Sequence, residues 1–330
     1  MMKYLLLLFC VFFIESIDAQ FKDLELDQKI TKKSSAEING EEIDFKVITG
    51  SQALFEDQNA IASIHYTYYK KENTDLQERP LVISFNGGPG SASLWMHLAY
   101  TGPKILSITD EGFPIQPYGI KDNPHSILDV ADILYVNPVN TGYSRALKNE
   151  DGKIDRDKFF GVQADIDYLA KWINLFISRN NRWLSPKFLI GESYGTTRVS
   201  GLALALQNQQ WAYLNGVILV SPTGLGIDRN GPVSAGNKLP YFTAAAWYHN
   251  QLSDELQNLS LENVLEKSES FTEKELIPGL LLGSALNKDK KKTLAKRYSE
   301  YSGLKTEEIL DHNMNVPYNY FWKNLLRSEE

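Results

Sequence analysis

Two kinds of hydrophobic pattern follow each other along the chain. Residues 45–55 and 62–70 alternate between apolar and polar positions and carry many β-branched and aromatic side chains, which predicts an opening pair of antiparallel strands. Short apolar runs, separated by stretches with helical spacing, then occupy residues 81–85, 133–136, 188–190 and 216–220. Apolar strands that alternate with helices are typical of a parallel sheet covered on both faces. The pattern therefore predicts an α/β fold on a mostly parallel central sheet.

Helical spacing is clearest in residues 157–180, where large apolar side chains recur about once per helical turn. From about residue 232 the strand pattern stops, and helical stretches with polar loops follow. We expect a single domain over residues 20–330 in which this helical region is inserted as a cap. Strands that would follow such a cap are missing from the pattern, so we expect the domain to be incomplete at its C-terminus.

The first nineteen residues resemble a secretory signal peptide, with Lys3, an apolar run at residues 4–14 and Ala19 before the cleavage point. The run has eleven residues and is too short to cross a bilayer; the alternatives are an N-terminal anchor or a buried strand. Its Cys10 is the only cysteine, so a chain starting at Gln20 would contain none. Export without disulfides fits a bacterial periplasm or exterior, where we place the protein.

Composition excludes several classes of protein. The chain has 330 residues, of which 43% are hydrophobic and 23% charged, as in ordinary globular proteins. With 34 basic and 41 acidic side chains it has a net charge of -7, which argues against a nucleic-acid-binding surface. No later stretch resembles a membrane span, and no His/Asp/Cys cluster has metal-ligand spacing. We predict neither a metal nor a cofactor.

The strongest chemical signal is Gly-Glu-Ser-Tyr-Gly at residues 191–195, which follows a predicted strand and precedes a helix rich in Ala and Leu. This is the nucleophile elbow in its required strand-turn-helix context. Small residues on either side of the serine let the chain reverse sharply. The amides at the start of the helix favour negative charge near the serine oxygen. We therefore predict Ser193 as the nucleophile of an acyl-transfer reaction.

A second signal is Phe-Asn-Gly-Gly-Pro-Gly at residues 85–90, which ends the first parallel strand. In this kind of fold an oxyanion hole takes one amide from the residue after the nucleophile and another from a loop after an earlier strand. Glycines let a substrate approach such a loop closely. A phosphate-binding loop is a poorer interpretation because no Lys-Ser or Lys-Thr follows the glycines. A plain turn is the remaining alternative.

Together these motifs resemble the serine carboxypeptidase family of α/β-hydrolases, and in particular its bacterial branch. Members carry Asn-Gly-Gly-Pro-Gly upstream and Gly-Glu-Ser-Tyr at the nucleophile. The likeness covers roughly residues 45–330 and extends to further motifs at residues 95–98, 102–103, 123–124, 129–132, 138–144, 185–188, 191–198 and 246–249. The chain departs from many members at Ser84, where they have tryptophan, and at Ser91, where eukaryotic members have cysteine.

The resemblance implies specific roles. Ser193 would attack the last peptide carbonyl, while the backbone amides of Gly88 and Tyr194 would form the oxyanion hole. Asn86 and Glu192 would bind the free C-terminal carboxylate of a peptide substrate. Because a carboxyl group facing an anionic substrate does not readily stay ionised, the pKa of Glu192 should rise and activity should be favoured at acidic pH.

The catalytic histidine and its acidic partner are harder to locate. In this fold both follow the nucleophile along the chain. Only His249 and His312 do so here, and neither has the strand-and-loop context of a catalytic base. His65, His97 and His125 precede Ser193. The resemblance implies that the acid and the histidine lie in a C-terminal segment beyond Glu330.

Two other functions stay open. The chain could be a non-catalytic peptide-binding module that has kept only the substrate-binding half of the enzyme. Alternatively, it could be an esterase or acyltransferase of the same fold, which would share the elbow but has no need of Asn86 and Glu192 as a carboxylate clamp.

Overall fold

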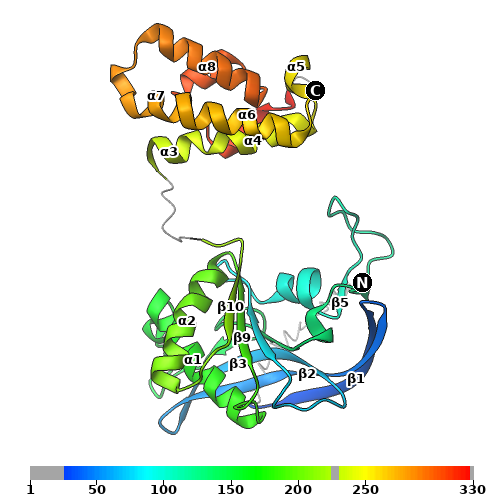
Figure 1. Ribbon diagram of the computed structural model, residues 1–330. Coiled ribbons are helices and arrows are strands. Elements are labelled where there is room, and N and C mark those ends of the chain that lie inside the picture. The colour runs from blue at the N-terminus through cyan, green and yellow to red at the C-terminus, as the bar shows by residue number, and fades with distance from the viewer. Residues whose placement is uncertain (1–25, 224–229, 328–330) are drawn as a thin grey trace, which may run out of the picture. The chain divides into compact units, whose positions relative to one another are not determined.

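The computed structural model describes residues 26–223 and 230–327, which form two compact units divided between residues 225 and 226 (Figure 1). The first contains all the strands described below, and the second is helical. The predicted signal peptide at residues 1–19, with Cys10, lies outside the described residues.

A mixed sheet forms the centre of the first unit. Its strands lie in the order β1-β2-β3-β7-β4-β9-β10, and the short β8 pairs with β3. Their bounds are β1 Lys29–Ile38, β2 Glu41–Glu56, β3 Asn59–Lys71, β4 Leu81–Phe85, β7 Asp132–Val136, β8 Arg145–Ala146, β9 Lys187–Glu192 and β10 Gly216–Val220. The strands β7, β4, β9 and β10 are mutually parallel and correspond to the four predicted apolar runs. The predicted parallel sheet is therefore confirmed.

The predicted antiparallel pair is also confirmed. β2 and β3 are paired from Phe45 opposite Lys71 to Glu56 opposite Asn59. The strand β1, which pairs along the outer side of β2, was not predicted, because its sequence is polar and its first six residues are exposed. Lysines on such an edge discourage pairing with other chains. A second small sheet joins β5 (Lys104–Leu106) to β6 (Ile120–Asp122).

Helices and loops cover the two faces of the sheet. α1 (Val162–Arg179) and α2 (Tyr194–Gln210) pack together on one face, where Trp172 and Phe176 of α1 are fully buried. The other face is covered in part by the π-helix η1 (Met96–Thr101) and the 3-10 turn η2 (Ile127–Asp129). The predicted helix at residues 157–180 starts later than expected, because another 3-10 turn, η3 (Arg156–Lys158), and Gly161 precede α1.

A buried ionic cluster holds the amino ends of the central strands. Asp132, at the start of β7, accepts hydrogen bonds from Arg79 Nε at 2.7 Å and from Arg182 Nη1, and the Lys71 amide donates to it at 3.0 Å. The side chains of Asp132 and Arg182 are fully buried. Two guanidinium groups on one carboxylate satisfy charges that would be costly to bury alone. The cluster thereby ties β3, β4 and β7 to the chain that follows α1.

The second unit is helical throughout its described residues. Its elements are α3 Gly231–Gly236, α4 Lys238–Tyr248, α5 Asp254–Gln257, α6 Leu261–Phe271, η4 Thr272–Leu276, α7 Ile277–Leu282, η5 Gly283–Ala285, α8 Lys288–Ser302, α9 Thr306–Asp311 and α10 Tyr318–Asn324. They enclose a core of their own that includes Phe242 and Phe321. The predicted change to helices near residue 232 is confirmed, and the role of this unit as a cap stays a prediction. Within the ranges described, no helix is both long and apolar enough to cross a membrane.

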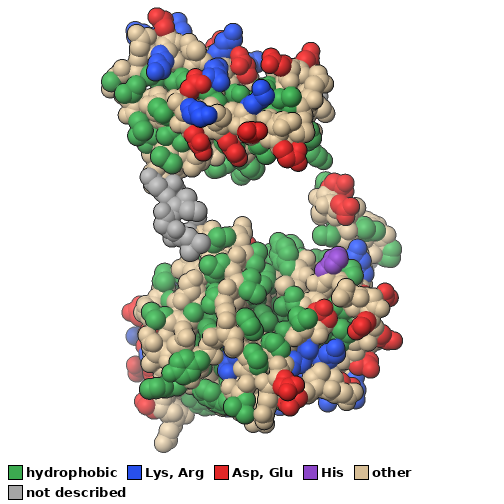
Figure 2. Space-filling view, in the orientation of Figure 1, with side chains coloured by type: hydrophobic (Ala, Val, Ile, Leu, Met, Phe, Trp, Pro, Cys, Tyr) green, Lys and Arg blue, Asp and Glu red, His purple; other side chains and the backbone are tan. Residues whose placement is uncertain are grey.

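The sheet has two edges of different character. β1 is polar, whereas β10 exposes Val217 and Ile218, and among the described strands β10 pairs only with β9. Figure 2 shows hydrophobic side chains on the surface in the region where Figure 1 labels β9 and β10. An apolar strand edge of this kind can accept a further strand. It adjoins β9, the strand that leads to the nucleophile elbow.

Candidate active site

The predicted nucleophile elbow is present between β9 and α2. Ser193 lies between the last residue of β9 and the first residue of α2, with φ 56° and ψ −123°. Its amide donates to the Val220 carbonyl at 3.0 Å, and its own carbonyl accepts from the Thr196 amide at 2.9 Å. A serine with positive φ is strained by roughly 1–3 kcal/mol, and such strain occurs mostly at functional sites. The sheet and α2 thus hold Ser193 in a turn at the carboxyl end of β9, where it is half-buried.

The glycines on either side of Ser193 are required by close backbone contacts. A Cβ atom added to Gly191 would lie 2.2 Å from the Gly195 carbonyl oxygen, and one added to Gly195 would lie 2.9 Å from the Phe85 carbonyl oxygen. Real side chains do not tolerate such distances to backbone atoms. The Gly-x-Ser-x-Gly spacing therefore follows from the turn itself and from the contact of α2 with the end of β4.

The glycine-rich loop after β4 lies directly against the elbow. A Cβ atom on Gly87 would lie 2.6 Å from the Tyr194 amide nitrogen and 2.8 Å from Ser193 Cβ. Gly88, the next residue, has φ 113°, a conformation that favours glycine. Within the described residues, neither the Gly88 amide nor the Tyr194 amide donates to a protein acceptor. The two amides predicted to form the oxyanion hole therefore have no protein acceptor among the described residues.

Asn86 and Glu192 are brought together across the sheet. Asn86 Nδ2 donates to Glu192 Oε2 at 3.1 Å, and Asn86 Oδ1 accepts from the Met96 amide at 3.0 Å. Asn86 is 1% exposed and Glu192 is half-buried. These residues end β4 and β9, which are neighbouring parallel strands, so their side chains meet at one edge of the sheet. An amide donor and a carboxyl group therefore lie together beside the nucleophile.

A buried arginine holds the glycine-rich loop in place. Arg198, on the first turns of α2, donates to the Asn86 carbonyl at 2.8 Å, to the Pro89 carbonyl at 3.2 Å and to Asp165 Oδ2 at 2.8 Å. It is 1% exposed. Burial raises the pKa of the Asp165 carboxyl, while Arg198 and the Tyr168 hydroxyl act in the opposite direction. Arg198 lies within a sequence motif, but its role could not be predicted, because its partners are distant in the chain.

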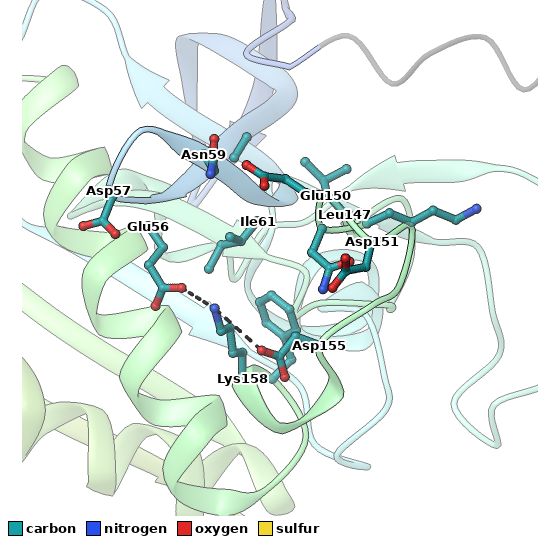
Figure 3. Close-up of a pocket in the computed structure, with 13 residues that line it drawn as sticks. Glu56, Asp57, Asn59, Ile61, Leu147, Glu150, Asp151, Asp155 and Lys158 are labelled. Atoms are coloured by element: carbon teal, nitrogen blue, oxygen red, sulfur yellow. Dashed lines mark hydrogen bonds and ion pairs between the residues drawn. The ribbon is translucent and has the colours of Figure 1, made fainter.

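Two of the cavities in the first unit differ in the residues that line them. One, of about 350 Å³, is lined mainly by apolar groups and by the Tyr194 side chain, with the Arg198–Asp165 pair at its wall. The other, of about 630 Å³, is lined by five carboxylate side chains and by Lys158, which bonds to Glu56 and Asp155 (Figure 3). None of the predicted site residues lines the second cavity. In the part of the chain that the structure describes, no group of His, Cys, Asp or Glu is arranged to hold a metal ion.

Among the described residues of the first unit, no histidine forms a hydrogen bond to Ser193. His65 bonds to Thr49 and Asn137, and His97 bonds to Tyr69. His125 has no side-chain bond to the elbow. His249 and His312 lie in the second unit, where His312 bonds to the Glu308 carbonyl. Within the first unit, the predicted nucleophile Ser193 and the Asn86–Glu192 pair thus lie together.

Comparison with known proteins assigns the chain to a family. The family model for serine carboxypeptidases matches residues 40–326. The chain belongs to the serine carboxypeptidase family. Together with the parallel sheet and the strand-turn-helix elbow, this membership confirms the predicted α/β-hydrolase fold. The assignment to a bacterial branch stays a prediction.

Individual relatives match only part of the chain. The pheromone-processing carboxypeptidase KEX1 of Saccharomyces cerevisiae is 29% identical over 161 residues, which are 46% of this chain and 21% of that protein. Serine carboxypeptidase-like 8 of Arabidopsis thaliana is 30% identical over 162 residues, which are 48% of this chain and 34% of that protein. A crystal structure of the S. cerevisiae KEX1 carboxypeptidase aligns with a TM-score of 0.44 at 20% identity, over 78% of this chain and 53% of that one. The matched regions thus span less than two thirds of these relatives.

Proposed function

We propose that the protein is a serine-type carboxypeptidase that hydrolyses the C-terminal peptide bond of peptides. The observation that carries this proposal is the Asn86–Glu192 hydrogen bond beside Ser193, because a nucleophile alone would suit any esterase. Ser193 Oγ would attack the last peptide carbonyl, and the Gly88 and Tyr194 amides would stabilise the oxyanion. The C-terminal amino acid would leave, and water would then release the acyl group from Ser193.

Asn86 and Glu192 would bind the substrate's free carboxylate. The Asn86 amide has two hydrogens, of which one bonds to Glu192 and the second can bond to the substrate. Glu192 would share a proton with the substrate carboxylate, since two ionised carboxylates in contact repel each other. The bound complex therefore requires one proton, and binding weakens as the pH rises. This is the basis for the expected preference for acidic pH.

The proposal also needs a base, which we expect from residues outside those described. Ser193 follows β9, and β10 is the neighbouring strand with an open apolar edge. A further strand added in parallel to β10 would end at the same edge of the sheet as Ser193. A histidine and an acidic residue in the loops after such strands would be in the order that this fold uses, Ser, Asp or Glu, His.

Replacing Glu192 with glutamine tests the clamp. The proposal predicts that Glu192→Gln removes most of the preference for an N-blocked dipeptide over its C-terminal amide and flattens the fall in kcat/KM as the pH rises. The measurement is kcat/KM for both substrates across the pH range. An unchanged preference and an unchanged profile would show that Glu192 has no role in carboxylate recognition. An equal preference for acid and amide in the unmodified protein would favour an esterase or acyltransferase.

Labelling with a fluorophosphonate separates the enzyme from a peptide-binding module. The binding module is the second candidate, because among the described residues of the first unit no histidine bonds to Ser193. The carboxypeptidase proposal predicts that Ser193 is labelled in the full-length product and that Ser193→Ala abolishes the label. A full-length product that binds peptide acids but is not labelled would support the binding module.

We further propose that the protein is exported, by means of the apolar segment at residues 1–19. N-terminal sequencing of the protein recovered from its native cells is expected to start at Gln20. Recovery of a chain that still starts at Met1 would contradict the proposal.

A further inference from the structure

The orientation of the Asn86 side chain depends on one backbone amide. A side-chain amide can present either its oxygen or its nitrogen to a neighbour, and the choice follows from its other partners. Here the Met96 amide donates to Asn86 Oδ1 at 3.0 Å, so Nδ2 must face Glu192. If the Met96 amide moved away, the oxygen of Asn86 could turn towards the Glu192 carboxyl group. The donor offered to a carboxylate would then be lost.

Met96 is the first residue of a π-helix. In η1, Met96–Thr101, the turns are wider than in an α-helix, and π-turns are rare and occur often at functional sites. The amides in the first turn of a helix have no partner within the helix. Asn86, on a loop ten residues earlier, accepts one of these hydrogens. The position of Asn86 therefore depends on how η1 is held.

A half-buried network closes η1 on itself. The Thr101 hydroxyl donates to the Met96 carbonyl at 2.8 Å, which joins the last residue of the π-helix to the first. The same hydroxyl lies 2.7 Å from the Tyr135 hydroxyl of β7. The Tyr135 ring stacks on His97 with centroids 4.5 Å apart, and His97 Nε2 bonds to the Tyr69 hydroxyl of β3 at 2.7 Å. Two neighbouring strands of the sheet, β3 and β7, thereby contact the helix at His97 and Thr101.

The far end of η1 is held by the loop after β6. Asn123 Nδ2 donates to the Tyr100 carbonyl at 2.9 Å and to the Gly102 carbonyl at 2.8 Å. The Ser126 hydroxyl donates to the Thr101 carbonyl at 2.8 Å. Both Asn123 and Ser126 are buried. The carbonyls that the end of a helix leaves without partners are therefore satisfied by side chains from another segment.

We propose that η1 is the positioning element of the carboxylate clamp and that Thr101 is its positioning residue, acting through Met96 on the orientation of Asn86. The inference rests on the proposed function, because it concerns the same clamp. Thr101 does not touch the substrate. Its hydroxyl joins the two ends of the helix whose first amide orients Asn86.

Equilibrium binding tests the inference without depending on a complete catalytic triad. The full chain with Ser193→Ala is titrated calorimetrically with an N-blocked dipeptide and with its C-terminal amide, and the ratio of the two Kd values measures carboxylate recognition. Adding Thr101→Val keeps the shape of the side chain and removes the hydroxyl. The ratio is expected to fall by about fivefold or more, as for the loss of one buried hydrogen bond. Adding Thr101→Ser instead should restore it.

Thr243 provides the matched control. Its buried hydroxyl likewise donates to a backbone carbonyl, that of Leu239 at 2.9 Å, and lies 2.7 Å from a second hydroxyl, that of Ser268. Thr243→Val should lower stability to a similar extent and leave the Kd ratio unchanged. If Thr101→Val does not fold, Tyr135→Phe decides, since it removes only the hydroxyl that contacts Thr101.

The outcomes separate the two claims. Equal Kd values for acid and amide in the Ser193→Ala chain would overturn the clamp, and with it the inference. A clear preference for the acid that survives both Thr101→Val and Tyr135→Phe would overturn the inference alone. A fall in the ratio with Thr243→Val as large as with Thr101→Val would show that the effect is general destabilisation, and would also overturn it.

Discussion

His97 is a titratable side chain that the fold holds in its neutral form. It lies between Tyr69 and Tyr135, with an edge contact to the first ring and a stacked contact to the second. Burial lowers the pKa of His97 from 6.5 to about 4. Among the described residues, no carboxylate is bonded to it to offset the loss of hydration. Protonation of His97 therefore works against the folded state.

This pKa shift predicts a pH dependence of stability. The unfolded chain takes up a proton at His97 near pH 6.5, and the folded protein does so only near pH 4. The contribution of neutral His97 to the free energy of unfolding is therefore fully present above pH 6.5 and is lost as the pH falls towards 4. The shift corresponds to a loss on the order of 3 kcal/mol. Urea unfolding at a series of pH values should show a shallower acid-side slope for His97→Gln than for the unmodified protein. Parallel curves for the two proteins would contradict the shift.

The loop between β4 and η1 depends on the absence of a side chain at one position. Gly87 lies against the elbow so closely that a Cβ atom would approach the Tyr194 nitrogen and Ser193 Cβ within 2.8 Å. At Gly90, three residues later, a Cβ atom would have no neighbour within 4 Å. The two glycines share a sequence motif but differ in what requires them. Gly87 is needed for contact between two elements, and Gly90 is not.

Alanine substitutions test this difference. Gly87→Ala should force the loop away from the elbow and lower the free energy of unfolding by about 3 kcal/mol, as overpacking against backbone atoms does. It should also weaken the binding of peptide acids, because Asn86 precedes it. Gly90→Ala should change the free energy of unfolding by less than about 0.5 kcal/mol. Both are measured by urea unfolding and calorimetry. Equal effects of the two substitutions would contradict the assigned contact.

At the scale of the whole molecule, the two units have separate cores. In the first unit, Phe176 of α1 packs with Tyr66, Tyr68 and Trp172. In the second, Phe242 of α4 stacks on Phe321 of α10 with centroids 4.0 Å apart. Among the described residues, the buried clusters of the two units have no member in common. Each core is closed by residues of its own unit.

A pair of reciprocal core substitutions tests this separation. Phe242→Ala should lower the stability of the second unit by about 3–5 kcal/mol, since it leaves a cavity in a fully buried site. Amide hydrogen exchange should then rise in α4, α6 and α10, while β4, β7 and β9 keep their protection. Phe176 is also fully buried, and Phe176→Ala should raise amide exchange in the first unit while the second keeps its protection. Loss of protection throughout both units with either substitution would show that the units unfold together.

The local patterns that the sequence carries by itself determined the parallel strands, the elbow and the change to helices. Apolar runs identify buried strands wherever they pair, and the contact that requires Gly191 is with Gly195, four residues later in the same turn. These features could be predicted because their causes are close together in the chain. By the same reasoning β1 was missed, since its polar residues take strand form only by pairing with β2.

Only the tertiary structure decided how the site is held. Asn86 and Glu192 are 106 residues apart, and they meet because β4 and β9 are adjacent in the sheet. Arg198 and Asn86, which are joined by a hydrogen bond, are similarly distant in the chain. Thr101 of η1 and Tyr135 of β7 are also in contact although other segments separate them in the chain. Such partners cannot be predicted from periodicity in the sequence, because each contact depends on the pairing order of the strands. The sequence predicted the reactive groups, and the sheet sets the orientation of their side chains.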